Sequence, residues 1–138
     1  MALVNITTEN TVITVNGRQI QDWGEAENPV MEEPIDASTT IRRGMGGNAV
    51  RLDRKNPGRR VTLSLNPGGA DAMYMQALYG SKANITYTRT VIGTLENAVG
   101  AEGAIVNDGA IGRAGGSSIT DDVFIMEFNS FTTLRGGA

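Results

Sequence analysis

The sequence predicts a mainly β protein: an antiparallel β-sandwich or barrel with one short packed α-helix and a long glycine-rich, basic loop. Three observations favour this class. Several short segments are rich in β-branched residues and alternate apolar with polar positions, as strands with one buried face do. One segment has helical spacing. Strands and helices do not alternate along the chain, which argues against a parallel α/β sheet.

The first predicted element is a β-hairpin near the start of the chain. Residues 11–15 are all β-branched, and Asn16-Gly17 suits a type I′ turn. Residues 18–23 return with polar alternation, which places Ile20 on one face of the hairpin.

The next stretch predicts irregular structure and then strands. Residues 24–34 contain two prolines and several acids, so we expect a loop or a short edge segment. Residues 35–42 are polar but β-prone and predict a strand. Residues 49–54 alternate apolar and charged side chains. Residues 59–65 predict a half-buried strand whose inward side chains are Val61, Leu63 and Leu65.

One helix is predicted over about residues 70–79. Asp71 lies in its first turn, where the helix dipole favours an acid, and Gly80 lies where a left-handed C-terminal cap would be. The helix is short and must pack on a sheet to be stable. Its expected apolar stripe consists of Ala70, Met73, Tyr74, Ala77 and Leu78.

The C-terminal part predicts two clear strands around a weak region. Residues 84–92 and 122–131 have strand character, and the second is the richest apolar run of the chain. Residues 93–116 form a glycine-rich, variable region in which we expect one short strand at 104–106. No internal repeat is evident, so we treat residues 1–138 as a single domain.

Composition excludes several classes of function. The 138 residues contain no Cys and no His, which removes disulfides, thiol nucleophiles, Ser-His-Asp catalysis and the commonest zinc sites. We therefore expect no enzymatic activity and no cofactor, with an enzyme that relies on carboxylates as a minor alternative. No run approaches the ~18 apolar residues of a membrane helix, so we expect no membrane anchoring.

Charge is segregated along a chain whose net charge is only −3. Six acids and no bases fall in one stretch: Asp22, Glu25, Glu27, Glu32, Glu33 and Asp36. Seven bases against one acid fall in the predicted loop at about 42–60: Arg42, Arg43, Arg51, Arg54, Lys55, Arg59 and Arg60.

Three interpretations of the basic stretch are open. It is a solvated hairpin without a partner, or it binds nucleic-acid phosphates, or it docks onto the acidic stretch of a neighbouring copy. The nucleic-acid interpretation is weakened because the stretch has no aromatic residue on which a base could stack. Docking between copies would be head to tail, and such contacts propagate into rings or filaments.

Three segments resemble the tail tube proteins of contractile-tailed bacteriophages. Residues 13–25 are similar to their opening hairpin, and residues 42–59 to their long charged loop. Residues 61–72, which lead into the helix, fit the same pattern, so the likeness covers roughly residues 11–79. Tube proteins of phage-derived bacteriocins and of type VI secretion share that fold.

The resemblance implies a structural virion protein that is assembled in the host bacterial cytoplasm. Six copies would close into a ring, and rings would stack into a hollow tail tube that conducts the genome. The long loop would reach the neighbouring ring. The implied partners are other copies of the chain, the tail sheath, and baseplate or terminator proteins, with double-stranded DNA passing through without specific binding.

A DNA channel should be polar and not cationic, because each lumenal Lys or Arg would hold phosphates. Strand faces rich in threonine or acids fit this requirement. The candidate lumen residues are Thr86, Thr88 and Thr90, or Asp36, Ser38 and Thr40.

Overall fold

The structure is a computed structural model, and it describes residues 11–113 and 119–135. Within these residues the chain forms nine strands and one α-helix, so the predicted mainly β class is confirmed. In chain order the elements are β1 (Thr11–Val15), β2 (Arg18–Gln19), β3 (Val30–Pro34), β4 (Thr39–Arg43), β5 (Ala49–Asp53), β6 (Arg59–Leu65), α1 (Ala70–Ser81), β7 (Ile85–Val91), β8 (Asn97–Asp108) and β9 (Asp122–Leu134).

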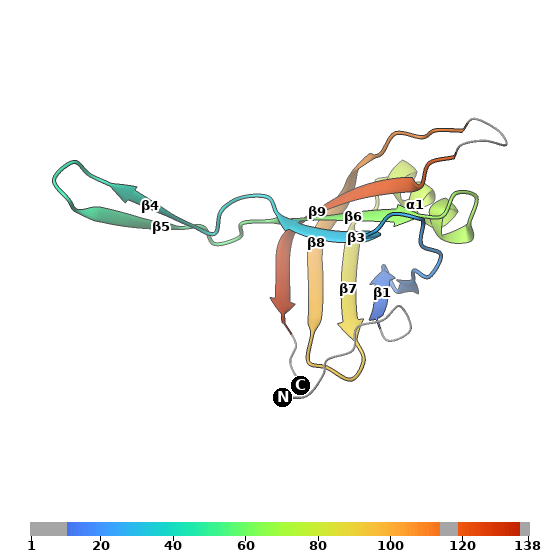
Figure 1. Ribbon diagram of the computed structural model, residues 1–138, viewed down its shortest axis with the longest axis horizontal. Helices are drawn as coiled ribbons and strands as arrows, with labels where there is room; N and C mark the ends of the chain where they lie inside the picture. Colours follow the sequence, from blue (N-terminus) through green and yellow to red (C-terminus); the bar gives the residue numbers. More distant parts are fainter. Residues whose placement is uncertain (1–10, 114–118, 136–138) are drawn as a thin grey trace.

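Seven strands form one antiparallel sheet in the order β2-β1-β7-β8-β9-β6-β3, and β4 pairs with β5 in a separate two-stranded sheet. The long strand β9 joins two regions of the large sheet, because residues 122–128 pair with β6 while residues 124–134 pair with β8. The sheet bends between these regions, and α1 lies beside it (Figure 1). β2 and β3 are the two edges, so the sheet is open over the described residues and does not close into a barrel.

The core is formed by the inward side chains of the bent sheet together with Ala72 and Met75 of α1. Val61, Leu63 and Leu65 are fully buried, as the alternation predicted. The first hairpin is also confirmed. Its turn residues have the positive φ angles that a type I′ turn needs, and Ile20 is buried behind it.

Three aromatic rings pack against one another, two inside this core and the partly buried Phe131 at its margin. Tyr87, Phe128 and Phe131 have ring centroids 5.8 to 6.0 Å apart. The rings lie directly against the backbone of β8 at Gly100 and Gly103, where an added Cβ would collide with Phe128 or Phe131. The two glycines therefore leave space for the rings rather than interrupt the strand.

The weak region predicted at 93–116 is the largest error of the sequence analysis. β8 runs from Asn97 to Asp108, far beyond the short strand expected at 104–106. Glycine has a low strand propensity, but packing against neighbouring strands outweighs it here. Residues 114–116 of the predicted region lie outside the described residues.

The helix position is confirmed, its stripe is right only for Tyr74 and Leu78, which pack against the core, and its cap is wrong. α1 buries Asp71, Ala72 and Met75, whereas Met73 of the predicted stripe is 71% exposed. The left-handed cap is Lys82, with φ 53°, and not Gly80. The apolar residues of this helix are spread over more than one face, so spacing alone did not identify the packed side. Among the described residues, no helix is long and apolar enough to cross a membrane.

Residues 24–43 differ in part from the prediction. The expected edge segment is β3, which pairs only with β6 in the large sheet. Residues 35–38, predicted as strand, precede the actual strand β4. Their backbone instead lies beside the two residues that precede β6, and the N–H groups of Ile35 and Asp36 donate hydrogen bonds to the carbonyls of Gly58 and Pro57.

A buried carboxylate ties α1 to the first hairpin. Asp71 accepts hydrogen bonds from the backbone N–H groups of Gln21 and Asp22, both at 2.9 Å, and from the Arg18 guanidinium at 3.0 Å. Arg18 also lies over the ring of Tyr74. Burial alone would raise the pKa of Asp71, but these hydrogen bonds outweigh it and hold the pKa below its ordinary value.

We expect Asp71→Asn to lower the free energy of unfolding by about 2 kcal/mol or more at neutral pH, because two backbone donors and Arg18 lose a charged acceptor. The pKa of Asp71 is lowered on folding, so this stabilisation is present above the unfolded-state pKa and is lost as pH falls through the folded-state pKa. Denaturant unfolding at successively lower pH measures both effects.

The control is Asp53→Asn, which changes an exposed carboxylate and should cost little at any pH. Equal losses from the two variants at neutral pH would contradict the role assigned to Asp71.

Candidate functional site

The two-stranded sheet projects from the body of the molecule as a long hairpin (Figure 1). We call residues 39–53 the arm. Every residue of β4 and β5 is exposed, and the strands pair from Thr39 with Asp53 to Arg43 with Ala49. At its base the Arg54 N–H donates to the Ser38 carbonyl at 2.8 Å. The arm is therefore a regular hairpin that is attached to the body at one end.

Both faces of the arm expose apolar side chains. Cross-strand register places Val50 and Leu52 on one face and Ile41 on the other, and each is more than half exposed. Met45, at the turn, is fully exposed. A two-stranded hairpin has marginal stability in water, and exposed apolar side chains mark surfaces that contact other molecules.

The seven predicted basic residues fall into three places. Arg42, Arg43 and Arg51 are in the arm, Arg54 and Lys55 follow it, and Arg59 and Arg60 belong to β6 of the large sheet. Some of these cations have partners in their own chain. They form the ion pairs Arg51–Asp53 at 2.9 Å, Arg54–Asp36 at 3.9 Å, Arg60–Glu33 at 3.3 Å and Arg60–Glu127 at 3.1 Å.

Several predicted acidic residues are also paired within the chain. Glu33 and Asp36 bind members of the basic set, because β3 runs antiparallel to β6 and brings the two stretches together. Glu32 binds Arg89. Among the described residues, Asp22, Glu25 and Glu27 make no ion pair, and the same is true of four bases, Arg42, Arg43, Lys55 and Arg59.

A cluster that the sequence analysis missed joins the edge strand β3 to β7. Arg89 lies 2.6 Å from both Glu32 and Glu96, and the Tyr87 hydroxyl donates to Glu32 at 2.6 Å. Burial opposes the charge on Arg89, but its hydrogen bonds to the two glutamates prevail and raise its pKa. Burial, together with the charge of Glu32, raises the pKa of Tyr87. The pKa values of Tyr87 and Arg89 are both raised, that is, moved further from neutral pH. The cluster therefore holds β3 against β7 and is not suited to proton transfer.

The predicted lumen residues do not form one surface. Ser38 and Thr40 are at the base and in the first strand of the arm, and Asp36 is beside them. Thr86, Thr88 and Thr90 are on the outer face of β7 in the body. The strand pairing also brings other residues beside this second group, which sequence reasoning did not find. Thr88 pairs with Thr14 of β1 on one side and with Val99 of β8 on the other.

We call the resulting surface the hydroxyl face. It extends over β1, β7, β8 and β9, and the hydroxyl groups of Thr14 and Thr88 are hydrogen-bonded to each other. The alternation of strand residues and the register place these uncharged residues on it: Val12, Thr14, Thr86, Thr88, Thr90, Asn97, Val99, Ala101, Ser130, Thr132 and Leu134. These positions carry no charge, and the exposed Glu102, at the bulge of β8, follows Ala101 directly in the strand.

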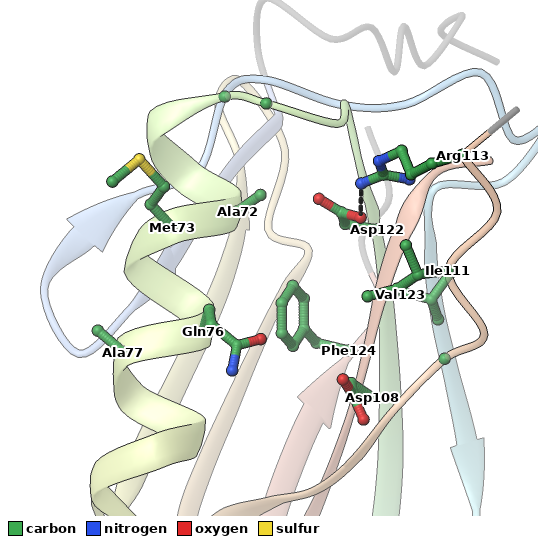
Figure 2. Close-up of a pocket in the computed structure, with 13 residues that line it drawn as sticks. Ala72, Met73, Gln76, Ala77, Asp108, Ile111, Arg113, Asp122, Val123 and Phe124 are labelled. Atoms are coloured by element: carbon green, nitrogen blue, oxygen red, sulfur yellow. Dashed lines mark hydrogen bonds and ion pairs between the residues drawn. The ribbon is translucent and has the colours of Figure 1, made fainter. Parts of the chain in front are cut away.

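An apolar groove of about 450 Å³ lies between α1 and the adjoining parts of β8 and β9. Figure 2 shows Ala72 and Gln76 of α1 facing the ring of Phe124 across it. Arg113 and Asp122 close one end with an ion pair of 2.6 Å. We call this surface the helix groove.

Among the described residues, no group of three or more Asp or Glu is placed to hold a metal ion. The expectation of no cofactor stays a prediction.

We expect that the arm can be removed without loss of stability, because it contributes no residue to the core. Replacing residues 39–53 with Asn-Gly should change the free energy of unfolding by less than about 1 kcal/mol, since Ser38 and Arg54 are already hydrogen-bonded across the base. Denaturant unfolding measures this. Phe128→Ala, which truncates a core ring, should cost about 3–5 kcal/mol and is the reference. A comparable loss on removing the arm would show that the arm stabilises the fold.

No family model and no curated protein matches the sequence. Solved structures do match. The chain is similar to a chain in the cryo-EM structure of the anti-feeding prophage cap (AFP tube terminating cap), with TM-score 0.62 and 12% identity over 97% of this chain and 93% of that one. It is also similar to a chain of the sheath/tube terminator of PVC, an extracellular contractile injection system, in its extended state (TM-score 0.62, 14% identity, 98% and 100% covered).

A third match is to the anti-feeding prophage baseplate, with TM-score 0.58 and 10% identity over 97% of both chains. At these identities the likeness concerns the fold, which covers nearly the whole length of each chain. The protein described here therefore has the fold of chains found in the caps, terminators and baseplates of contractile injection systems.

Proposed function

We propose that this chain is a structural subunit of the tube of a phage-tail-like contractile particle. Copies close into rings, six to a ring as the sequence resemblance implies, and the rings stack into a hollow tube. The observation that carries the proposal is the arm. It is a fully exposed hairpin with apolar and cationic side chains that its own chain does not cover, on a fold shared with contractile injection systems.

The arm is long enough to reach another copy. Met45 is seven positions beyond Ser38, and at about 3.3 Å per residue these seven steps span roughly 23 Å. Arg42 and Arg43 near the tip have no ion pair among the described residues. Of the acidic set, Asp22, Glu25 and Glu27 have none either, so they are available to attract the arm of a neighbour.

Closure into a ring uses the edges of the large sheet. β3 pairs with β6 on one side only, and β2 is the opposite edge. An unpaired edge offers N–H and C=O groups to a strand of another copy, which makes an isolated subunit prone to association. Pairing between copies in a ring would satisfy these groups and extend the sheet.

The hydroxyl face is the candidate wall of the conduit. Its threonines and serine offer hydrogen bonds to water, and the absence of Lys and Arg from its positions means that it would not retain phosphates. This property suits passage of double-stranded DNA without specific binding. Ser38 and Thr40 lie toward the arm and fit this role less well.

The same architecture supports further partners in the particle. Similar chains occur in a tube-terminating cap, a sheath/tube terminator and a baseplate. By analogy we propose that this subunit contacts sheath, terminator and baseplate proteins in the particle. Its role is structural and needs no catalytic site.

Nucleic-acid binding by the arm is the alternative function. The exposed arginines favour it, but the arm contains no aromatic side chain, and the Arg51 charge is paired with Asp53. If it were correct, DNA affinity of the purified chain would fall steeply with salt, and neutralising Arg42 and Arg43 would reduce that slope.

The proposal predicts rings or hollow tubes of purified protein in negative-stain micrographs, and fast-sedimenting species in ultracentrifugation. Arg42→Glu combined with Arg43→Glu should prevent stacking and leave the fold intact, because both arginines are exposed in the arm. Lys82→Glu, an exposed charge reversal at the end of α1, is the control and should assemble normally.

Two results would contradict the proposal. A chain that stays monomeric at high concentration would argue against a self-assembling subunit. Normal tubes from the double arginine variant would show that charge near the arm tip plays no part in stacking.

A further inference from the structure

The arm tip and the helix groove lie at opposite ends of the molecule. In Figure 1 the arm extends to one side of the body, and α1 lies on the other side. A contact between the tip of one copy and the groove of another therefore joins the two copies head to tail. Contacts of this kind leave a tip and a groove unoccupied at the ends and can repeat indefinitely.

The arm tip presents a single large side chain, that of Met45. Met45 lies between Gly44 and the pair Gly46-Gly47, and the last of these has φ +89°, a conformation that favours glycine. Because these glycines have no side chains, Met45 projects by itself and is fully exposed. An unbranched, polarizable Met side chain adapts well to an irregular apolar pocket.

The helix groove has the matching chemistry. Its lining is largely apolar and includes Ala72, Ala77 and Phe124, and its volume of about 450 Å³ exceeds that of one Met side chain. Asp108 also lines it and makes no ion pair with another described residue. A carboxylate without an ion partner beside an apolar groove suits a ligand that combines an apolar tip with a positive charge.

We propose that Met45 of one copy inserts into the helix groove of the next copy, with one of the two arginines next to the tip, which lie on opposite faces of the hairpin, facing Asp108. The arm meets both requirements, because Arg42 and Arg43 lie three and two residues before Met45 and make no ion pair among the described residues. The inference rests on the proposed tube function and identifies where the arm docks.

Cysteine cross-linking tests this contact without background, since the natural chain contains no Cys. We would combine Met45→Cys with Gln76→Cys, whose side chain faces the groove in Figure 2. A disulfide requires Cα atoms about 4–7 Å apart, so it forms only if the tip enters the groove. Mild oxidation should give a ladder of linked copies that a reductant collapses to monomer.

The matched control is Met45→Cys combined with Thr90→Cys on the hydroxyl face, which should give no ladder. In a mixture of the two single variants, Met45→Cys and Gln76→Cys, cross-linking should stop at linked pairs.

A ladder that forms only with the Met45/Gln76 double variant supports the inference. Assembly without a preferential ladder would overturn it and leave the tube function standing, because the arm would then dock elsewhere or another ligand would fill the groove. Failure of the natural chain to assemble would overturn both.

A second measurement does not depend on disulfides. Met45→Asp should raise the protein concentration needed for assembly by about tenfold or more, because the apolar side chain is lost and a charge is placed beside Asp108. Met45→Leu retains the apolar volume and should assemble nearly as the natural chain does. Equal assembly by the Asp and Leu variants would overturn the insertion of Met45.

Discussion

A two-stranded hairpin cannot bury its own side chains, and this constraint governs the interpretation of the whole molecule. The arm exposes Ile41, Val50, Leu52 and Met45, and each face also has arginine. The body, by contrast, has a continuous core around the Tyr87, Phe128 and Phe131 rings. The two parts therefore have different roles. The body contains the whole core, and the arm leaves apolar surface exposed.

Some charged residues form ion pairs within the chain, and others have no ion pair among the described residues. Part of the acidic stretch pairs with the basic stretch of the same chain. Glu33 binds Arg60 between β3 and β6, and Asp36 binds Arg54 near the base of the arm. Glu32 forms an ion pair with Arg89 in the cluster that joins β3 to β7. Arg42 and Arg43 near the arm tip, Glu25 and Glu27 before β3, and Asp108 in the helix groove have no ion pair among the described residues, so they are the charges available for contacts between copies.

The two faces of the large sheet differ in chemistry. On the inner face, Gly100 and Gly103 leave space for two aromatic rings. On the outer face of the same strands, uncharged threonines and small residues form the hydroxyl face. β-branched threonine keeps strand geometry without charge, so the same alternation supplies an apolar interior and a neutral wall.

Local patterns along the chain are enough to predict several of its features. These are the mainly β class, the charge segregation, the Asn16-Gly17 turn and the inward side chains Val61, Leu63 and Leu65. Three other features can be seen only in the folded chain: the buried face of the helix, the single long strand at residues 97–108, and the pairing of charges. These features depend on residues distant in sequence, such as Phe128 against Gly103 or Arg89 against Glu32, and local spacing does not encode which distant partner occupies a given space.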